Sequence, residues 1–84
     1  MLRTLVCLFD SKAQMFLSPF VVPHLAVAFR EIKTAAARKG EGNGLADYPG
    51  DFQLYELGTF DDSSGDVEGL LRLVCDVRSI VEGE

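Results

Sequence analysis

The sequence predicts a small α+β domain in which one amphipathic helix packs on a mostly antiparallel sheet. Four short segments are rich in apolar, aromatic and β-branched residues, one segment has helical periodicity, and their order along the chain is β-β-α-β-β. The chain has 84 residues, of which 48% are hydrophobic and 25% charged. This length and composition predict a single folded domain with one hydrophobic core.

The first half of the sheet is predicted from residues 2–9 and 14–22. Residues 2–9 (LRTLVCLF) have apolar side chains on both sides, as in a strand buried on both faces. Asp10 and Ser11 favour a turn, because their side chains can hydrogen-bond to the backbone that follows. Pro19 has no N–H for a ladder, so the strand over residues 14–22 is expected to be an edge strand or to be interrupted there.

The helix is predicted over residues 24–39. Pro23 favours a helix start through its fixed φ, and Gly40 is expected to end the helix. Apolar residues recur at the helical period and form one stripe that would pack on the sheet: Leu25, Ala28, Phe29, Ile32 and Ala36.

The segment after the helix is expected to be a loop. Residues 40–51 (GEGNGLADYPGD) hold four glycines and a proline and have no periodicity, which predicts a mobile, glycine-rich connection. Residues 52–60 (FQLYELGTF) predict a third strand. Residues 61–65 (DDSSG) then form a strong turn signal.

The last strand is expected over residues 70–77, and its pattern allows it to continue through Ile80. An apolar strand near the end of so short a chain is expected to pair with another copy. The sequence therefore predicts a homodimer or a larger homo-oligomer formed through residues 70–80. Alternation places four of its side chains on one face: Leu71, Leu73, Cys75 and Val77.

Cysteine usage and the N-terminal segment indicate a cytoplasmic protein. Cys7 and Cys75 lie inside apolar runs and belong to no CxxC pair or Cys/His cluster, so both are expected to be small buried residues in neighbouring strands. Neither a metal nor a cofactor is expected. Asp10 and Lys12 interrupt the first apolar run, which argues against a signal peptide, and no apolar stretch is long enough for a membrane span.

No group of residues provides the nucleophile and nearby base that a catalytic site requires, so the sequence predicts a protein that is not an enzyme. The one histidine, His24, lies at the expected helix start without an obvious partner. Asp61 and Asp62 belong first of all to the expected turn. The glycines at positions 40, 42 and 44 follow a helix instead of a strand, which disfavours a phosphate-binding loop.

Charge is distributed unevenly along the chain. Residues 1–40 carry six Lys or Arg and two Asp or Glu, whereas residues 41–84 carry two and eleven. Such an asymmetry suggests an anionic partner for the first half. If the partner is single-stranded DNA, cations would contact phosphates and a tyrosine would stack on a base. The candidate residues are Arg30, Lys33, Arg38 and Lys39 for phosphates, and Tyr48 or Tyr55 for stacking. The alternative is that the cations only solubilise the helix and the phenylalanines form the core.

Two blocks resemble a known family. The strings DSKA at 10–13 and FLSPF at 16–20, and the block DFQLYELGTFDDSSG at 51–65, are similar to the signature of the nonstructural protein of gokushovirus-type microviruses, which are bacteriophages with small circular single-stranded DNA genomes. The motif Ala28-Phe29-Arg30 is also similar in placement. The resemblance covers residues 3–66. The glycine-rich segment replaces a loop that contains Asn and His in the family, and residues 70–84 have no counterpart.

The resemblance implies a protein made during infection, present in the cytoplasm of the host bacterium and absent from the virion. It further implies binding to single-stranded DNA during viral genome synthesis or packaging. A second hypothesis remains beside it, namely a protein-interaction module that binds a host or phage replication protein through its acidic half. A salt-dependent shift of a labelled oligonucleotide would separate the two.

Overall fold

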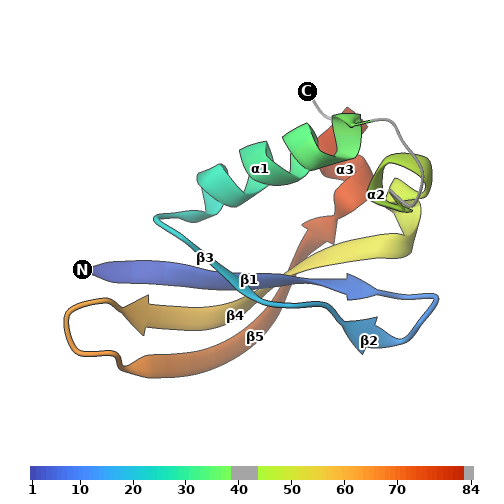
Figure 1. Ribbon diagram of the computed structural model, residues 1–84. Coiled ribbons are helices and arrows are strands. Elements are labelled where there is room, and N and C mark those ends of the chain that lie inside the picture. Colours follow the sequence, from blue (N-terminus) through green and yellow to red (C-terminus); the bar gives the residue numbers. More distant parts are fainter. Residues whose placement is uncertain (39–43, 83–84) are drawn as a thin grey trace.

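The computed structural model describes residues 1–38 and 44–82 and has the predicted α+β architecture. Five strands form one antiparallel sheet, and helices cover one of its faces (Figure 1). The elements are β1 (Leu2–Asp10), β2 (Met15–Phe16), β3 (Phe20–Val22), α1 (Leu25–Ala37), α2 (Gly44–Asp47), the 3-10 turn η1 (Pro49–Asp51), β4 (Phe52–Asp61), β5 (Val67–Asp76) and α3 (Val77–Glu82).

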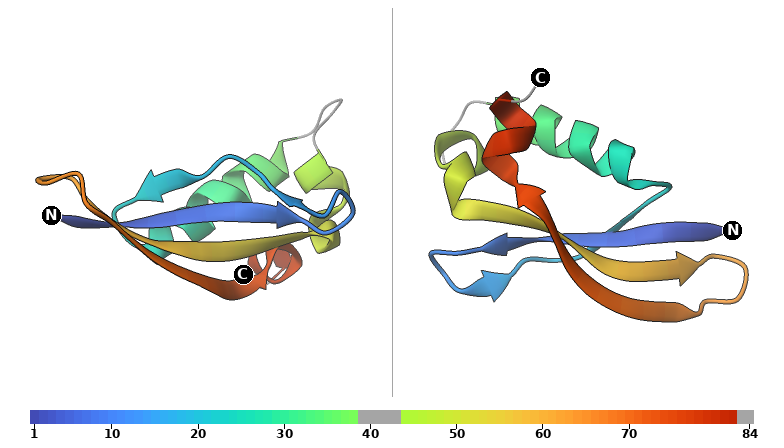
Figure 2. Two further views of the ribbon diagram at one scale, coloured as in Figure 1. Left: turned by 90° about the horizontal axis from the view of Figure 1, so that it is seen from below. Right: turned by 180° about the vertical axis from the view of Figure 1, so that it is seen from behind.

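The strand β1 organises the sheet. It pairs with β4 along its whole length, from Leu2 opposite Asp61 to Asp10 opposite Phe52. On its other side it pairs first with β3 and then with β2, while β5 pairs with β4 and ends the sheet. The left view of Figure 2 shows the strands from below, with α1 behind them. We call the sheet face on the side of α1 the covered face and the opposite face the open face.

The hydrophobic core lies between the covered face and α1. The predicted helix stripe is confirmed, since Ala28, Ile32 and Ala36 are buried, and Leu25 and Phe29 pack on the core while half-buried. Burial of these apolar side chains is the main stabilising contribution of the helix, since short helices are marginal alone. The buried cluster consists of Val6, Val22, Ala28, Ile32, Leu54 and Val77.

Turn chemistry acts as predicted in the first hairpin. The Asp10 carboxylate accepts hydrogen bonds from the backbone N–H of Lys12 at 3.0 Å and of Ala13 at 3.2 Å. The expected interruption at Pro19 is also confirmed, because the second strand is split into β2 and β3 around it. Both pieces lie at an edge of the sheet.

The connection after α1 is more regular than predicted. Residues 44–51 form the short helix α2 and the turn η1, although the pattern there predicted only a loop. Tertiary contacts explain the difference: Leu45 packs against the core, and the guanidinium of Arg78 lies directly over Gly50. The expected helix end at Gly40 and the first part of the expected mobile loop lie outside the described residues.

The prediction that the last strand continues to Ile80 is wrong. β5 ends at Asp76, and the chain turns at once into α3. The spacing of Val77, Ile80 and Val81 is i, i+3, i+4, so a helix here directs all three side chains at the core, which a strand could not do. The hydroxyl of Ser79 donates to the backbone carbonyl of Asp76 at 2.7 Å and supports the first turn.

The prediction that Leu71, Leu73, Cys75 and Val77 share one face of the last strand is also wrong. The β4–β5 register shifts twice, between Leu54 and Tyr55 and between Glu56 and Gly58, and each bulge breaks the alternation of β5. Consequently, Leu73 is exposed opposite Tyr55, whereas Cys75 is half-buried opposite Leu54, whose side chain belongs to the core. The two cysteines do not lie in neighbouring strands either, because β4 separates β1 from β5. Cys7 is buried, Cys75 is half-buried, and both thiols are free.

Candidate functional site

The candidate cations on α1 are presented to solvent as the helical pattern predicts. Arg30 and Lys33 are exposed and lie three residues apart, on neighbouring turns of the helix. Arg38 follows the last turn, where its backbone N–H donates to the carbonyl of Ala35. Lys39 lies outside the described residues. We call Arg30, Lys33 and Arg38 the basic face of α1.

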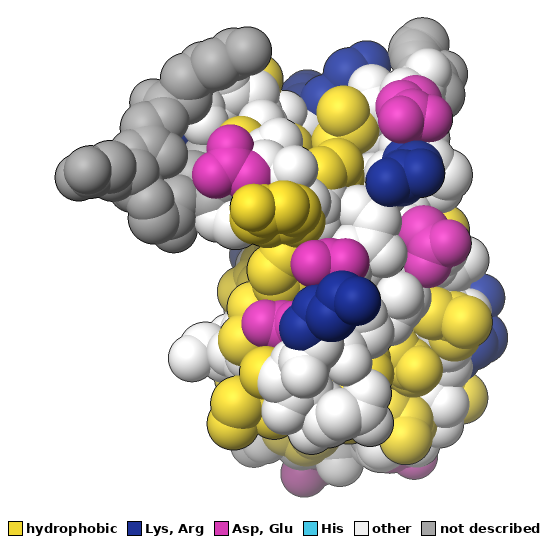
Figure 3. Space-filling model, turned by 90° about the vertical axis from the view of Figure 1, so that its right-hand side faces the viewer, with side chains coloured by type: hydrophobic (Ala, Val, Ile, Leu, Met, Phe, Trp, Pro, Cys, Tyr) yellow, Lys and Arg dark blue, Asp and Glu magenta, His cyan; other side chains and the backbone are white. Residues whose placement is uncertain are grey.

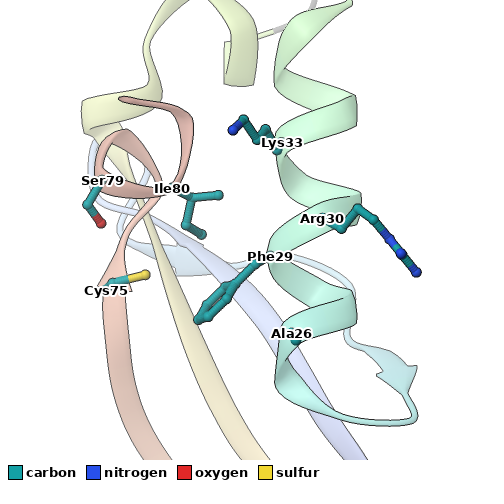
Figure 4. A pocket seen from close by; sticks show the side chains of 7 residues that line it. All are labelled: Ala26, Phe29, Arg30, Lys33, Cys75, Ser79 and Ile80. Atoms are coloured by element: carbon teal, nitrogen blue, oxygen red, sulfur yellow. The ribbon is translucent and has the colours of Figure 1, made fainter. Parts of the chain in front are cut away.

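A hollow of about 500 Å³ separates the basic face of α1 from α3. In Figure 4, Phe29, Cys75 and Ile80 point into the space between α1 and α3, Lys33 extends over it toward α3, and Arg30 points outward. The floor is therefore apolar and the rim on the α1 side is basic. The residues that line it are Ala26, Phe29, Arg30, Lys33, Cys75, Ser79 and Ile80.

This arrangement suits a ligand that is amphipathic and anionic. An aromatic or apolar group could cover Phe29 and Ile80, while a negative group lies near Lys33. A lysine at such a rim keeps its ammonium in water while its stem covers apolar surface.

A second, shallower hollow continues along α1 and connects Arg30 with Arg38. Thr34 lies between them, one helical turn from each, and Glu31 lines the same hollow. The Glu31 carboxylate reduces the positive potential there. The basic face is therefore a short row of cations with one acid beside it.

The structure separates Tyr55 from these cations. Its chain neighbour Leu54 is buried on the covered face, so alternation along β4 places Tyr55 on the open face. There its ring packs edge-on against Phe16, at a centroid distance of 5.1 Å, and against Phe9, at 6.0 Å. A base stacked on Tyr55, as predicted, would therefore lie on the other side of the sheet from a phosphate bound at α1. Tyr48 is exposed and directly precedes η1.

The sequence pattern did not indicate five residues of the main hollow: Ala26, Phe29, Cys75, Ser79 and Ile80. Phe29 was assigned to the core stripe, and Cys75 and Ile80 to a strand. Once residues 77–82 are read as a helix, the i, i+3 spacing of Val77 and Ile80 predicts an apolar face that packs on the core, and in the structure this face lies beside α1. That spacing was the available signal.

The acidic groups of the last hairpin are held by specific contacts, as the turn prediction implies. Asp61 accepts a hydrogen bond from the Ser63 N–H at 2.9 Å, and this bond contributes most to lowering the pKa of the Asp61 carboxyl group. Arg3 donates from Nε to Asp62 at 2.8 Å and is the main cause that lowers the pKa of Asp62. Both carboxylates are exposed enough for salt to screen these contacts.

The remaining candidates for chemistry are placed as follows. His24 is exposed at the N-cap of α1 and makes no side-chain capping hydrogen bond. Burial raises the pKa of the Cys7 thiol, which makes a reactive thiolate there less accessible. Across residues 1–38 and 44–82, no three His, Cys, Asp or Glu side chains gather as metal ligands.

Charged groups of both signs alternate on the side of the molecule shown in Figure 3, with separate apolar patches between them. That side therefore offers no surface of one sign. In the described part of the chain, no helix has both the length and the apolar character needed to cross a membrane.

Comparisons with known proteins give one match. A family model described as phage ORF5 protein matches residues 3–80, which is most of the chain. Neither the curated proteins nor the solved structures include a significant match.

Proposed function

The chain belongs to the phage ORF5 protein family, and we propose that it binds viral single-stranded DNA. More narrowly, we propose that it is the nonstructural protein of a gokushovirus-type microvirus and acts in the host cytoplasm during genome synthesis or packaging. The blocks at residues 10–20 and 51–65 support the narrower assignment, because their order and spacing are specific.

One observation carries the DNA-binding proposal: Lys33 and Arg30 border a hollow whose floor is apolar. A nucleotide of a single strand has the matching chemistry, with a base that can stack and a phosphate that carries charge. We propose that Phe29 and Ile80 contact a base while Lys33 holds the adjacent phosphate.

The second hollow extends this path along α1. Arg30 borders both hollows, and Arg38 lies at the far end of the second one. A backbone that leaves the first hollow would pass these two guanidinium groups, each of which can hydrogen-bond to phosphate oxygens. Because no base-specific contact is required, the binding would tolerate many sequences.

Lys33→Ala tests the phosphate contact. Loss of one phosphate contact lowers the slope of log affinity against log salt by about 0.7 for a single strand, and Arg30→Ala/Lys33→Ala should lower it by about twice that amount. The measurement is fluorescence anisotropy of a labelled oligonucleotide over a salt series, with circular dichroism to verify folding.

Lys12→Ala is the matched control, because it removes the same charge from the exposed β1–β2 turn, away from α1. Its salt slope should equal that of the unmodified protein. Equal slopes for Lys12→Ala and Lys33→Ala would show that only net charge matters, and would reject α1 as the binding surface.

The second candidate is a protein-interaction module that binds a host or phage replication protein through its acidic half. A hollow at the β4–β5 hairpin favours it, since Asp61, Asp66 and Glu68 surround it together with Leu2 and Val67. If the oligonucleotide does not bind even at low salt, the first proposal fails and this one becomes the stronger.

A further inference from the structure

The strand β5 has features of an association surface. It is the last strand of the sheet, so one side of its backbone has no strand partner within the described residues. Unpaired edges of this kind readily accept another strand. In addition, four large apolar side chains on it are more than half exposed: Val67, Leu70, Leu71 and Leu73.

Its centre is held in an unusual conformation. Leu71 has φ 55°, a left-handed value that a non-glycine residue rarely adopts and that costs about 1–3 kcal/mol. The bulge places Leu70 and Leu71 opposite the single residue Leu57 of β4. Both side chains are thereby released from the ladder and exposed to solvent. Bulges also occur at protected edges, but those edges carry charged side chains, whereas this one exposes apolar groups, as binding surfaces do.

The charges on β5 indicate what covers it. Glu68 and Arg72 lie two residues on either side of Leu70, with opposite signs. Glu68 pairs with Thr59 of β4, which in turn pairs with Thr4 of β1. Arg72 pairs with Glu56 of β4, which in turn pairs with Val6 of β1. Thr4 and Val6 are two residues apart on β1 and therefore point to the same face. Glu68 and Arg72 therefore share a face, and an antiparallel copy of this strand centred on Leu70 would place each Glu68 opposite an Arg72.

The guanidinium of Arg72 can donate hydrogen bonds to a second carboxylate, that of Glu68 in the other copy. Its Nε and Nη2 both donate to the Oε1 of Glu56 in the same chain. An arginine has five N–H donors, so donors remain after this contact. The Glu56 contact also fixes the side chain in place, which reduces the entropy lost when a further contact forms.

From this self-complementarity we infer that β5 pairs with β5 of a second copy of this chain, antiparallel and centred on Leu70. Leu70 meets its own symmetry mate on the two-fold axis, and Glu68 pairs with Arg72 twice. This interface is shorter than the segment 70–80 predicted from the sequence, because residues beyond Asp76 belong to α3 and face the core.

Such a dimer has a defined symmetry. Edge-to-edge pairing of antiparallel strands requires a two-fold axis perpendicular to the sheet, so both α1 helices lie on the same side of one continuous sheet. The interface uses the end of β5 nearest the β4–β5 turn, while α3 lies at its other end (Figure 1).

Sedimentation velocity of the complete chain, without nucleic acid, tests the inference. The unmodified protein should sediment as a dimer at micromolar concentration, and Leu70→Lys should shift it to a monomer, because it places two cations together on the axis. Val21→Lys is the matched control: it adds the same charge at an exposed apolar position on β3, at the opposite edge, and should leave the dimer intact.

A cross-linking experiment decides the question if Leu70→Lys does not fold. In a Cys75→Ser background, Leu70→Cys should form a covalent dimer on mild oxidation, since the two residues are directly opposite, whereas Val21→Cys should not. A monomeric unmodified protein, an assembly that survives Leu70→Lys, or equal cross-linking at both positions would overturn the inference. None of these results depends on DNA binding, so the two proposals can fail separately.

Discussion

Gly58 lies where the backbones of β4 and β5 approach most closely. Its φ is +148°, and a Cβ at this position would lie 1.8 Å from the carbonyl oxygen of Glu68. No side chain fits there without separating the two strands. Its ladder partner Gly69 is different, because no atom lies within 4 Å of the Cβ position there.

This contrast predicts opposite outcomes for one substitution at two paired glycines. Gly58→Ala should lower the free energy of unfolding by about 2–4 kcal/mol, through the φ value and the clash with Glu68. Gly69→Ala should change it by less than about 1 kcal/mol. Urea denaturation measures both, and similar losses at the two positions would contradict the described approach of the strands.

Asp62 predicts a pH dependence of stability. Arg3, followed by the amine of Met1, holds the pKa of its carboxyl group below the ordinary value of 3.8. A carboxyl group whose pKa is lower in the folded state stabilises the fold above 3.8 and loses this contribution as the pH falls through the folded value.

Asp62→Asn should therefore lower the free energy of unfolding at neutral pH. The variant should also lose less stability than the unmodified protein as the pH falls, so that the stability curves of the two proteins converge at low pH. Arg3→Ala should have a similar but smaller effect, since the amine contact persists. Thermal unfolding between neutral and acidic pH tests this, and parallel curves would refute the assignment.

At the scale of elements, α3 is stabilised by the core more than by its own turns. It has six residues, too few for a helix to be stable alone, but Val77 is fully buried beside α1. Ile80 and Val81 pack against the same core. This packing also forms the second wall of the hollow that borders Lys33.

Val77→Ala should lower the free energy of unfolding by about 2 kcal/mol, because it removes buried methyl groups and leaves a cavity. Val67→Ala is the matched control at the other end of β5, where the side chain is exposed, and should be nearly neutral. Equal effects in chemical denaturation would mean that α3 is not docked as described.

At the scale of the whole molecule, one sheet separates two different surfaces. The helices and the basic face of α1 lie on the covered side, while Phe9, Phe16 and Tyr55 cluster on the open face. In the proposed dimer, the two basic faces lie on the same side of the continuous sheet. A single strand of DNA long enough to span them would be bound twice.

A monomeric variant should therefore lose affinity in a length-dependent way. Leu70→Lys should bind a long oligonucleotide about 100-fold more weakly than the unmodified protein, because the second contact becomes intermolecular. An oligonucleotide too short to reach both α1 helices should bind both proteins equally. Anisotropy titrations with the two lengths make the comparison, and the same loss at both lengths would show that Leu70 acts on the site itself.

Features that depend on local patterns can be predicted from the amino-acid sequence. The helical period from Leu25 to Ala36 specifies α1 and its buried stripe, and turn chemistry at Asp10 and at residues 61–65 specifies both hairpins. The exposure of Arg30 and Lys33 follows from the same period. These features need only neighbours in the sequence, so their physical causes can be read there.

Features that depend on register and packing follow from contacts between distant segments. Residues 77–82 suit a strand or a helix locally, and contact with the core selects the helix. The bulges of β5 arise from its pairing with β4, and they expose Leu70 and Leu71. Alternation along β4 then places Tyr55 on the open face, away from the cations of α1. Each outcome depends on segments distant in sequence, whose contact energies outweigh local preference.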